Sequence, residues 1–183
     1  MNTPRATEAD ITRIVGSNHH DPFEILGMHP IWHDGTQHIT VRCFHPDARS
    51  VAVLDTATGT PVGELECRHD EGFFEGDIPE RETVFQYQLR LTHHDGSHRT
   101  VADPYSFGPV LSEFDLHLYG EGSHLNLFDK LGAQVLDHEG ASGVAFSVWA
   151  PAAQRLSVVG DFNAWDGRRH PMRARGASGV WEL

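Results

Sequence analysis

An aromatic side chain in a polar loop is the feature of this 183-residue chain best suited to chemistry. Trp165 stands between Phe162-Asn163-Ala164 and Asp166-Gly167-Arg168, a stretch rich in residues that favour turns. The C–H face of a sugar ring packs on a flat indole, while amide and carboxylate groups hydrogen-bond its hydroxyls. We therefore select Trp165, Asn163 and Trp181 as candidate substrate-binding residues. The alternative for Trp165 is that it covers the end of its own domain or packs against a neighbouring one.

Two pairs of carboxylates, Glu64 with Glu66 and Glu80 with Glu82, have residue types that general acid–base catalysis uses. The members of each pair are two residues apart on or near a predicted strand, which places both side chains on one face. A solvated strand edge accounts for this spacing better than a catalytic site does. We expect no catalytic residue within these 183 positions.

Metal-binding spacing is missing from the fourteen histidines. His19-His20 and His93-His94 are adjacent pairs, and neighbouring residues on a strand point to opposite faces. Zinc-binding motifs instead separate two histidines so that both can reach one ion. We therefore predict neither a metal nor a cofactor. Cys43 falls on the inward side of an alternating strand, which favours a free buried thiol, although a disulfide with Cys67 is the other arrangement open to it.

The charge and the first residues restrict partners and location. The net charge of −12 opposes binding to nucleic acid or to an anionic membrane. No apolar run reaches the ~18 residues that a membrane-spanning helix needs. The first fifteen residues lack the apolar core of a secretory signal, so we expect a cytoplasmic protein.

The elements that would position these residues are mainly strands. Residues 7–17 are an exception: Thr7 is suited to cap a short helix, Asp10 stands at the capping-box position, and apolar residues follow at helical spacing. Further on, short alternating runs separated by turn residues about every ten residues indicate a β-sandwich. The predicted strands are 39–44, 50–54, 62–66, 73–78 and 84–91, and a single helical turn is expected around Glu113 to Tyr119.

The strand pattern recurs 105 positions later, since Phe23 returns as Phe128 and Val53 as Val158. Between residues 23–55 and 128–160, 8 of 33 aligned pairs are identical, where unrelated sequences give roughly 2. A period this long favours two tandem copies of one β-domain. The identical positions are Phe23, Leu26, Gly27, His33, Gly35, Pro46, Ala48 and Val53, which return as Phe128, Leu131, Gly132, His138, Gly140, Pro151, Ala153 and Val158.

The second copy is expected to be incomplete. Gly179-Val180-Trp181 matches Gly72-Phe73-Phe74 with a two-residue slip, and the sequence ends at Leu183. About 35 residues, the counterparts of Glu75 to Pro109, then have no equivalent. A sheet lacking its last strands would leave an apolar face and unpaired backbone edges in water. We therefore expect the amino-terminal part of a longer protein.

These observations predict an all-β fold of two tandem immunoglobulin-like β-sandwiches, the second truncated, with a short N-terminal helix. The expected organisation is an N-terminal helical segment at 1–21, a first sandwich at 22–109, a linker at 110–126 and a second sandwich at 127–183. The first copy has no counterpart of Trp165, so we expect it to serve mainly as a spacer or docking domain.

The other tryptophans have different surroundings. Trp149 aligns with Phe44 inside a strand, which favours core packing or contact at the strand edge. Trp181 aligns with Phe74 and could face either way. Trp32 precedes a His33-Asp34-Gly35 turn, where a second sugar contact is a weaker hypothesis.

Two stretches of the chain resemble bacterial glycogen branching enzymes. The first is Asp21-Pro22-Phe23-Glu24-Ile25-Leu26-Gly27-Met28-His29. The second runs from Phe146 to Ala153 and from Leu156 to Met172, and it is similar to a family-48 carbohydrate-binding module. Its extension Trp165-Asp166-Gly167-Arg168-Arg169-His170-Pro171-Met172 is typical of branching enzymes within that family. The resemblance covers essentially the entire chain.

This resemblance implies cleavage of α-1,4-glucan and re-attachment of the cut chain through an α-1,6 bond. The reaction is a retaining transglycosylation by two carboxyl groups on a (β/α)₈ barrel, which needs at least ~200 residues. Neither carboxyl segment is found in residues 1–183, so we expect this part alone to be inactive. In binding members of the module family, the tryptophan that matches Trp165 stacks on glucose.

The implied partners are α-1,4-glucan or glycogen and a catalytic barrel downstream in the same protein. The alternatives are a non-catalytic glycogen-binding or regulatory module, the N-terminus of a debranching-type relative, and a pair of sandwiches used only for protein contacts.

Overall fold

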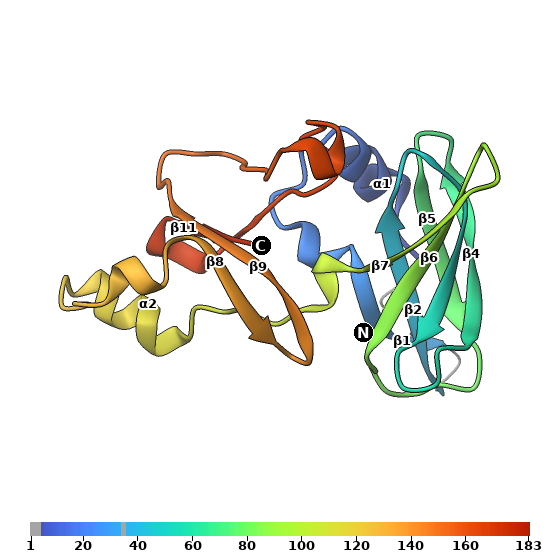
Figure 1. The fold of residues 1–183 in the computed structure, drawn as a ribbon, viewed down its shortest axis with the longest axis horizontal. Coiled ribbons are helices and arrows are strands. Elements are labelled where there is room, and N and C mark those ends of the chain that lie inside the picture. Colours follow the sequence, from blue (N-terminus) through green and yellow to red (C-terminus); the bar gives the residue numbers. More distant parts are fainter. Residues whose placement is uncertain (1–4, 34–35) are drawn as a thin grey trace. The chain divides into compact units, whose positions relative to one another are not determined.

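The computed structural model describes residues 5–33 and 36–183, which divide into two compact units. The first unit comprises the chain up to His19 together with Phe23–Ser106, and the second comprises His20–Pro22 and Phe107–Leu183. Both consist mainly of antiparallel strands with few helices (Figure 1), so the predicted all-β class is confirmed. None of the helices in the described residues is long and apolar enough to cross a bilayer.

The first unit is one helix followed by seven strands. The sheet order is β1-β2-β5-β4-β3-β6-β7, and every pair is antiparallel. Its core combines side chains of β2 and β5 with side chains of β3 and β6, so the sheet folds over into two layers around them. The elements are α1 (Glu8–Val15), β1 (Gly27–His33), β2 (Thr36–Phe44), β3 (Ala48–Asp55), β4 (Pro61–His69), β5 (Phe73–Ile78), β6 (Tyr87–His93) and β7 (His98–Ala102), with short 3₁₀ turns at Pro22–Glu24 and Pro104–Ser106.

The predicted N-terminal helix is confirmed as α1. Thr7 caps it, because its Oγ1 accepts a hydrogen bond from the Asp10 amide at 3.2 Å and donates one to Asp10 Oδ2 at 2.6 Å. The apolar stripe of the helix is buried and packs beside Phe44 and Phe73 of the sheet. A helix of eight residues is marginal alone, so this packing is what holds it.

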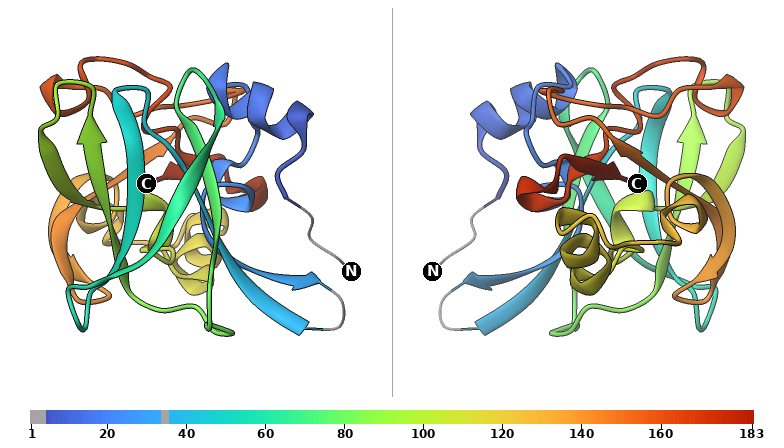
Figure 2. Two further views of the ribbon diagram at one scale, coloured as in Figure 1. Left: turned by 90° about the vertical axis from the view of Figure 1, so that its right-hand side faces the viewer. Right: turned by 90° about the vertical axis from the view of Figure 1, so that its left-hand side faces the viewer.

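Two edge strands, β1 and β7, were not predicted. Figure 2 shows β1 with β2 as a hairpin, in blue to light blue. Pro30 interrupts the pattern of β1, and proline is tolerated there because β1 lies at an edge of the sheet. β7 is polar and mostly exposed, which leaves no alternating signal. The predicted strand 84–91 begins at Tyr87 instead, while Val84 is exposed.

Asp103 and Tyr105 close the first unit. Asp103 is buried and accepts hydrogen bonds from the Tyr87 hydroxyl at 2.5 Å and the Tyr105 amide at 3.0 Å. Burial raises the pKa of Asp103 from 3.8 to about 6. The Tyr105 ring meets Phe23 edge-to-face at 5.0 Å, so this tyrosine packs against its own unit.

The second unit repeats half of this arrangement. Its sheet order is β10-β11-β9-β8, which corresponds to β4-β5-β2-β1 of the first unit. The elements are α2 (Glu113–Gly120), β8 (Gly132–His138), β9 (Ala141–Trp149), β10 (Arg173–Ala174) and β11 (Val180–Glu182), with 3₁₀ turns at Leu127–Asp129, Asp161–Asn163 and Gly176–Ser178.

The offset of 105 residues is kept without change over the helix and the first two strands of each unit. α2, β8 and β9 begin and end 105 positions after α1, β1 and β2. The hairpin register is also kept, since Gly27 pairs with Arg42 and Gly132 with Ser147. Ser112 caps α2 through a capping box with Asp115, as Thr7 caps α1. The segment predicted as a linker therefore contains a helix of eight residues where a single turn was expected.

The two-residue slip is confirmed by the pairing of β11. Phe73 pairs with Phe44 in the first unit, and Val180 pairs with Trp149 in the second. The glycines before these strands, Gly72 and Gly179, have φ of 99° and 74°. A Cβ would lie 2.5 Å from Pro46 Cα at Gly72 and 2.7 Å from Pro151 Cβ at Gly179, so both turns require glycine.

A buried glutamate ties the start of each helix to its sheet. Glu75 Oε1 accepts hydrogen bonds from the Ala6 amide at 2.8 Å and Arg42 Nε at 2.7 Å, and its other oxygen pairs with Arg68. Glu182 accepts one from the Leu111 amide at 3.1 Å. Both glutamates are 2% exposed.

One cation beside each glutamate corresponds as well, whereas Arg42 aligns with Ser147 and Arg173 with Glu66. Arg175, the counterpart of Arg68, lies 3.0 Å from Glu182, and Arg173 lies 2.8 Å from it. Arg68 and Arg175 also reach the first helical residues, Glu8 at 3.6 Å and Glu113 at 2.9 Å. Glu182 is thus the counterpart of Glu75, which corrects the prediction that no equivalent of Glu75 is present.

The layer of the first unit that contains β3 and β6 is not repeated in the second unit. Residues 153–160 align with β3 but make only one isolated bridge, between Ser157 and Pro171. β3 is held on both sides, by β4 and β6, and residues 107–183 contain no counterpart of β6. Val144 and Val148 are therefore 47% and 41% exposed. The chain between β9 and β10 is consequently a long loop.

Candidate functional site

The loop that carries Trp165 has a closed backbone. Ala164 and Trp165 follow the turn Asp161–Asn163 and both adopt left-handed conformations, with φ of 55° and 59°. The Trp165 amide donates to Gly160 O at 3.0 Å, and the Asp166 amide donates to Asn163 O at 3.1 Å. Each non-glycine residue in this region costs of order 1–3 kcal/mol, so other contacts must hold the turn.

Asn163 supplies those contacts from inside the loop. Its Oδ1 accepts from the Gly160 amide at 3.0 Å, while Nδ2 donates to Val158 O at 2.8 Å and to His170 Nδ1 at 2.9 Å. The side chain is 1% exposed. In this conformation Asn163 holds the turn from inside, and its predicted sugar contact would require the loop to open.

Trp165 projects from this turn. It is 66% exposed, and its Nε1 donates to Asp161 Oδ1 at 2.8 Å. That hydrogen bond satisfies the polar edge of the indole while the ring remains available to solvent. Asp166 instead accepts from Arg168 Nε at 3.0 Å and Nη2 at 2.9 Å, and this guanidinium holds the pKa of Asp166 below its usual range.

The structure does not bring the three predicted site residues together. Trp181 lies in β11 and is 6% exposed, with its Nε1 donating to Ala150 O at 3.1 Å. It packs in its sheet and offers no face to a ligand in this conformation. Only Trp165 of the three is accessible.

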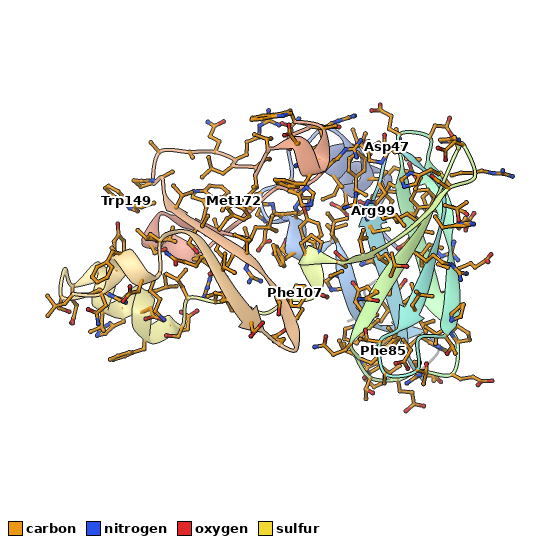
Figure 3. The ribbon with its side chains drawn as sticks, viewed as in Figure 1. Asp47, Phe85, Arg99, Phe107, Trp149 and Met172 are labelled. Carbon is orange, nitrogen blue, oxygen red and sulfur yellow. The ribbon has the colours of Figure 1, made fainter. Side chains whose placement is uncertain are left out.

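Two further tryptophans are exposed. Trp149, labelled in Figure 3, is 55% exposed and meets Tyr119 of α2 edge-to-face at 6.3 Å. It therefore keeps the aligned position of Phe44 beside the helix without being buried. Trp32 is 48% exposed in β1. The predicted turn after it includes Asp34 and Gly35, which lie outside the described residues.

The carboxylate pairs lie exposed to solvent and the two thiols are free, as the sequence analysis favoured. Glu64 and Glu66 are both exposed and flank the buried Leu65, and Glu80 and Glu82 are exposed as well. Cys43 is a buried free thiol, as expected from its place on the inward side of β2, and Cys67 is an exposed free thiol.

The sequence-based selection missed His170 and Asp161. Both belong to the polar loop, and the signal for His170 was its place in the Arg168-Arg169-His170-Pro171 stretch. Spacing alone does not reveal that an imidazole accepts a hydrogen bond from an asparagine seven residues earlier.

Acidification is expected to loosen this loop. Burial, together with the neighbouring Arg169 guanidinium, lowers the pKa of His170 from 6.5 to about 4, so the ring is neutral at pH 7 and Nδ1 can accept from Asn163. Because the folded-state pKa is the lower one, the stabilisation is complete above pH 6.5 and is lost as the pH falls towards 4. It amounts to about 2–3 kcal/mol.

Titration of the His170 ring by NMR between pH 3.5 and 8 measures this effect. We expect the amide signals around Trp165 to move with the same midpoint as the His170 ring. An ordinary midpoint near 6.5 would contradict the described hydrogen bond.

Two known protein families match the chain, one over most of the first unit and the other over the end of the second unit, including the Trp165 loop. The family described as "alpha-1,4-glucan branching enzyme GlgB, N-terminal domain" matches residues 7–105, more than half of the chain. The chain belongs to this family. The family described as carbohydrate-binding module 48 (isoamylase N-terminal domain) matches residues 130–183, which include β8, β9 and the Trp165 loop. The resemblance to branching enzymes and to a family-48 module is thereby confirmed.

Curated relatives of the branching-enzyme family match nearly the whole chain. The 1,4-alpha-glucan branching enzyme GlgB of Rhodospirillum rubrum is 43% identical over 181 residues, covering 98% of this chain and 24% of the relative. That of Mesorhizobium japonicum is 49% identical over 179 residues, covering 97% and 23%. The chain thus spans about a quarter of the length of these relatives.

Among solved structures, a pullulanase from Anoxybacillus sp. LM18-11 complexed with maltotriose is 18% identical. The match covers 86% of this chain and 22% of the pullulanase, with a TM-score of 0.22. That score is too low to support a statement about the fold.

Proposed function

We propose that the second unit binds α-1,4-glucan through Trp165, and that the chain is the non-catalytic N-terminal part of a glycogen branching enzyme. The observation that carries the glucan contact is the exposed indole on a preformed loop, with its N–H already bonded to Asp161. A fixed aromatic platform stacks on a sugar ring with little loss of conformational entropy.

The whole protein would cleave α-1,4-glucan and re-attach the released chain through an α-1,6 bond. In such a retaining transglycosylation, one carboxylate forms a glycosyl-enzyme and a carboxylic acid protonates the leaving oxygen. The carboxylate pairs of this chain lie exposed on strands or turns, which does not suit that chemistry. We assign the reaction to a catalytic barrel elsewhere in the protein and place the protein in the cytoplasm.

The role of the second unit is to hold glucan close to that barrel. Tethering a binding module to a catalytic domain raises the local concentration of substrate without new chemistry. The exposure of Trp165 favours this role, because a tryptophan that served only to cover the core of its own unit would itself be buried there. The competing possibility, that the barrel covers Trp165, is an outcome of the tests below.

Co-sedimentation with glycogen tests the proposal. The 183-residue chain is expected to pellet with glycogen, to be released by maltoheptaose and to be unaffected by the β-linked cellopentaose. The intact enzyme acting on amylose is expected to shift the iodine absorbance without releasing reducing ends. A chain that stays in the supernatant would refute the glucan-binding role, and release of reducing ends would indicate hydrolysis instead of branching.

A further inference from the structure

An exposed tryptophan of the first unit, Trp32, lines an open hollow. Trp32 of β1 is 48% exposed, and the hollow next to it has a volume of about 390 Å³. This volume is within the range of small-molecule sites. The residues that line it are Trp32, Thr36, Gln37, Glu82 and Thr83.

Trp32 is not required by the shared fold. Its counterpart 105 positions later in β8 is Asp137, so the same hairpin position accepts a carboxylate in the second copy. Its partner across the strands is the polar Gln37. Two residues further along β2 on the same face, Ile39 is 0% exposed. The tryptophan therefore stands just outside the core.

Another aromatic residue covers the core near this end of the first unit. Phe85 packs against the core cluster, with the Arg81 guanidinium 4.7 Å from the centre of its ring. Figure 3 labels Phe85 at the end of the first unit. Phe85 thus packs on the core here, and about half of the Trp32 side chain is left open to solvent.

The polar residues of the hollow are fixed next to the indole. Gln37 Nε2 donates to Glu82 O at 2.5 Å, which ties the segment containing Glu82 and Thr83 to β2. Thr36, Thr83 and Glu82, whose side chains carry hydroxyl and carboxylate groups, then border the same space as Trp32. An indole face beside hydroxyl and carboxylate groups is the combination that recognises a neutral sugar, through stacking and hydrogen bonds to its hydroxyls.

We propose that this hollow is a second α-glucan-binding site, centred on Trp32 and independent of Trp165. The choice of an α-linked glucan over another sugar rests on the proposed function of the second unit. Two sites on one tether would bind glycogen more tightly than either alone, because the second contact forms within the same complex. The first unit would then contribute directly to glucan binding and not serve only as a spacer.

An NMR titration of the ¹⁵N-tryptophan-labelled chain tests the site. The indole signal of Trp32 is assigned with Trp32→Phe, and maltoheptaose is added to the native chain and to Trp165→Ala. We expect the Trp32 signal to shift saturably in both. In the Trp165→Ala background, Trp32→Ala should weaken the remaining glycogen binding by at least about threefold, the loss of one aromatic contact.

The controls separate this site from the one in the second unit. Val84→Ala changes a residue that is 58% exposed and next in sequence to Thr83 of the hollow, and it should leave affinity unchanged. A Trp32 signal that does not shift, or that shifts only while Trp165 is present, would overturn the second site. An equal response to cellopentaose would overturn its assignment to α-glucan. If Trp32 responds and Trp165 does not, the second site stands and the proposed function of the Trp165 loop fails.

Discussion

Replacing Glu75 with glutamine is expected to destabilise the first unit by about 3–5 kcal/mol, the usual cost of removing one partner from a buried ion pair. Arg42 is 2% exposed and would lose the carboxylate that faces its guanidinium, because its Nε lies 2.7 Å from Glu75 Oε1. The glutamine amide would also face Arg68, which pairs with the second carboxylate oxygen. The Ala6 amide would compete for the single remaining acceptor.

Hydrogen exchange of amides in β2 and β5 measures this loss. A destabilisation of 3–5 kcal/mol corresponds to exchange faster by about two to three and a half orders of magnitude. Glu66→Gln is the matched control on the neighbouring strand, since the ion pair of Glu66 with Arg5 at 3.4 Å is exposed and its loss should change stability little. Equal effects of the two substitutions would show that the buried network does not hold the unit together.

Replacing Trp165 with alanine is expected to weaken maltoheptaose binding to the second unit by about tenfold or more, or about 1.4 kcal/mol. The indole is 66% exposed, so its removal leaves no cavity. The turn should persist, because Asn163 holds it from inside through Gly160, Val158 and His170. A loss of affinity would therefore report the missing ring.

Two variants separate stacking from other effects of this substitution. Trp165→Phe keeps an aromatic ring but removes the hydrogen bond to Asp161, and it should retain most of the affinity. Trp149→Ala removes a comparably exposed indole from the same unit and should leave binding unchanged. If Trp165→Phe binds as weakly as Trp165→Ala, stacking is not the main contact. Isothermal calorimetry gives the three affinities.

The sequence was sufficient to predict the fold class, the repeat and the helix. Alternating apolar residues and turn residues at regular intervals are local signals, and the constant offset of 105 is read by aligning the chain with itself. The structure reproduces these signals down to the register of β8 and β9. The exposed position of Trp165 also followed from its polar surroundings.

Features that depend on contacts distant in the sequence could not be predicted. Glu75 and Ala6 are 69 residues apart, and nothing local shows that they meet. The two-residue slip relates Glu182 to Glu75, but nothing local shows that both carboxylates are buried. Asn163 was selected for its hydrogen-bonding groups, yet the loop directs all of them inward.

The most direct test of the central claim is a search for nuclear Overhauser effects between maltoheptaose and the ring protons of Trp165 in the 183-residue chain. Contact between the sugar C–H protons and the indole face is the result we predict. Saturating maltoheptaose with no transfer to the Trp165 ring would contradict the account, because the glucan would then be held elsewhere or not at all.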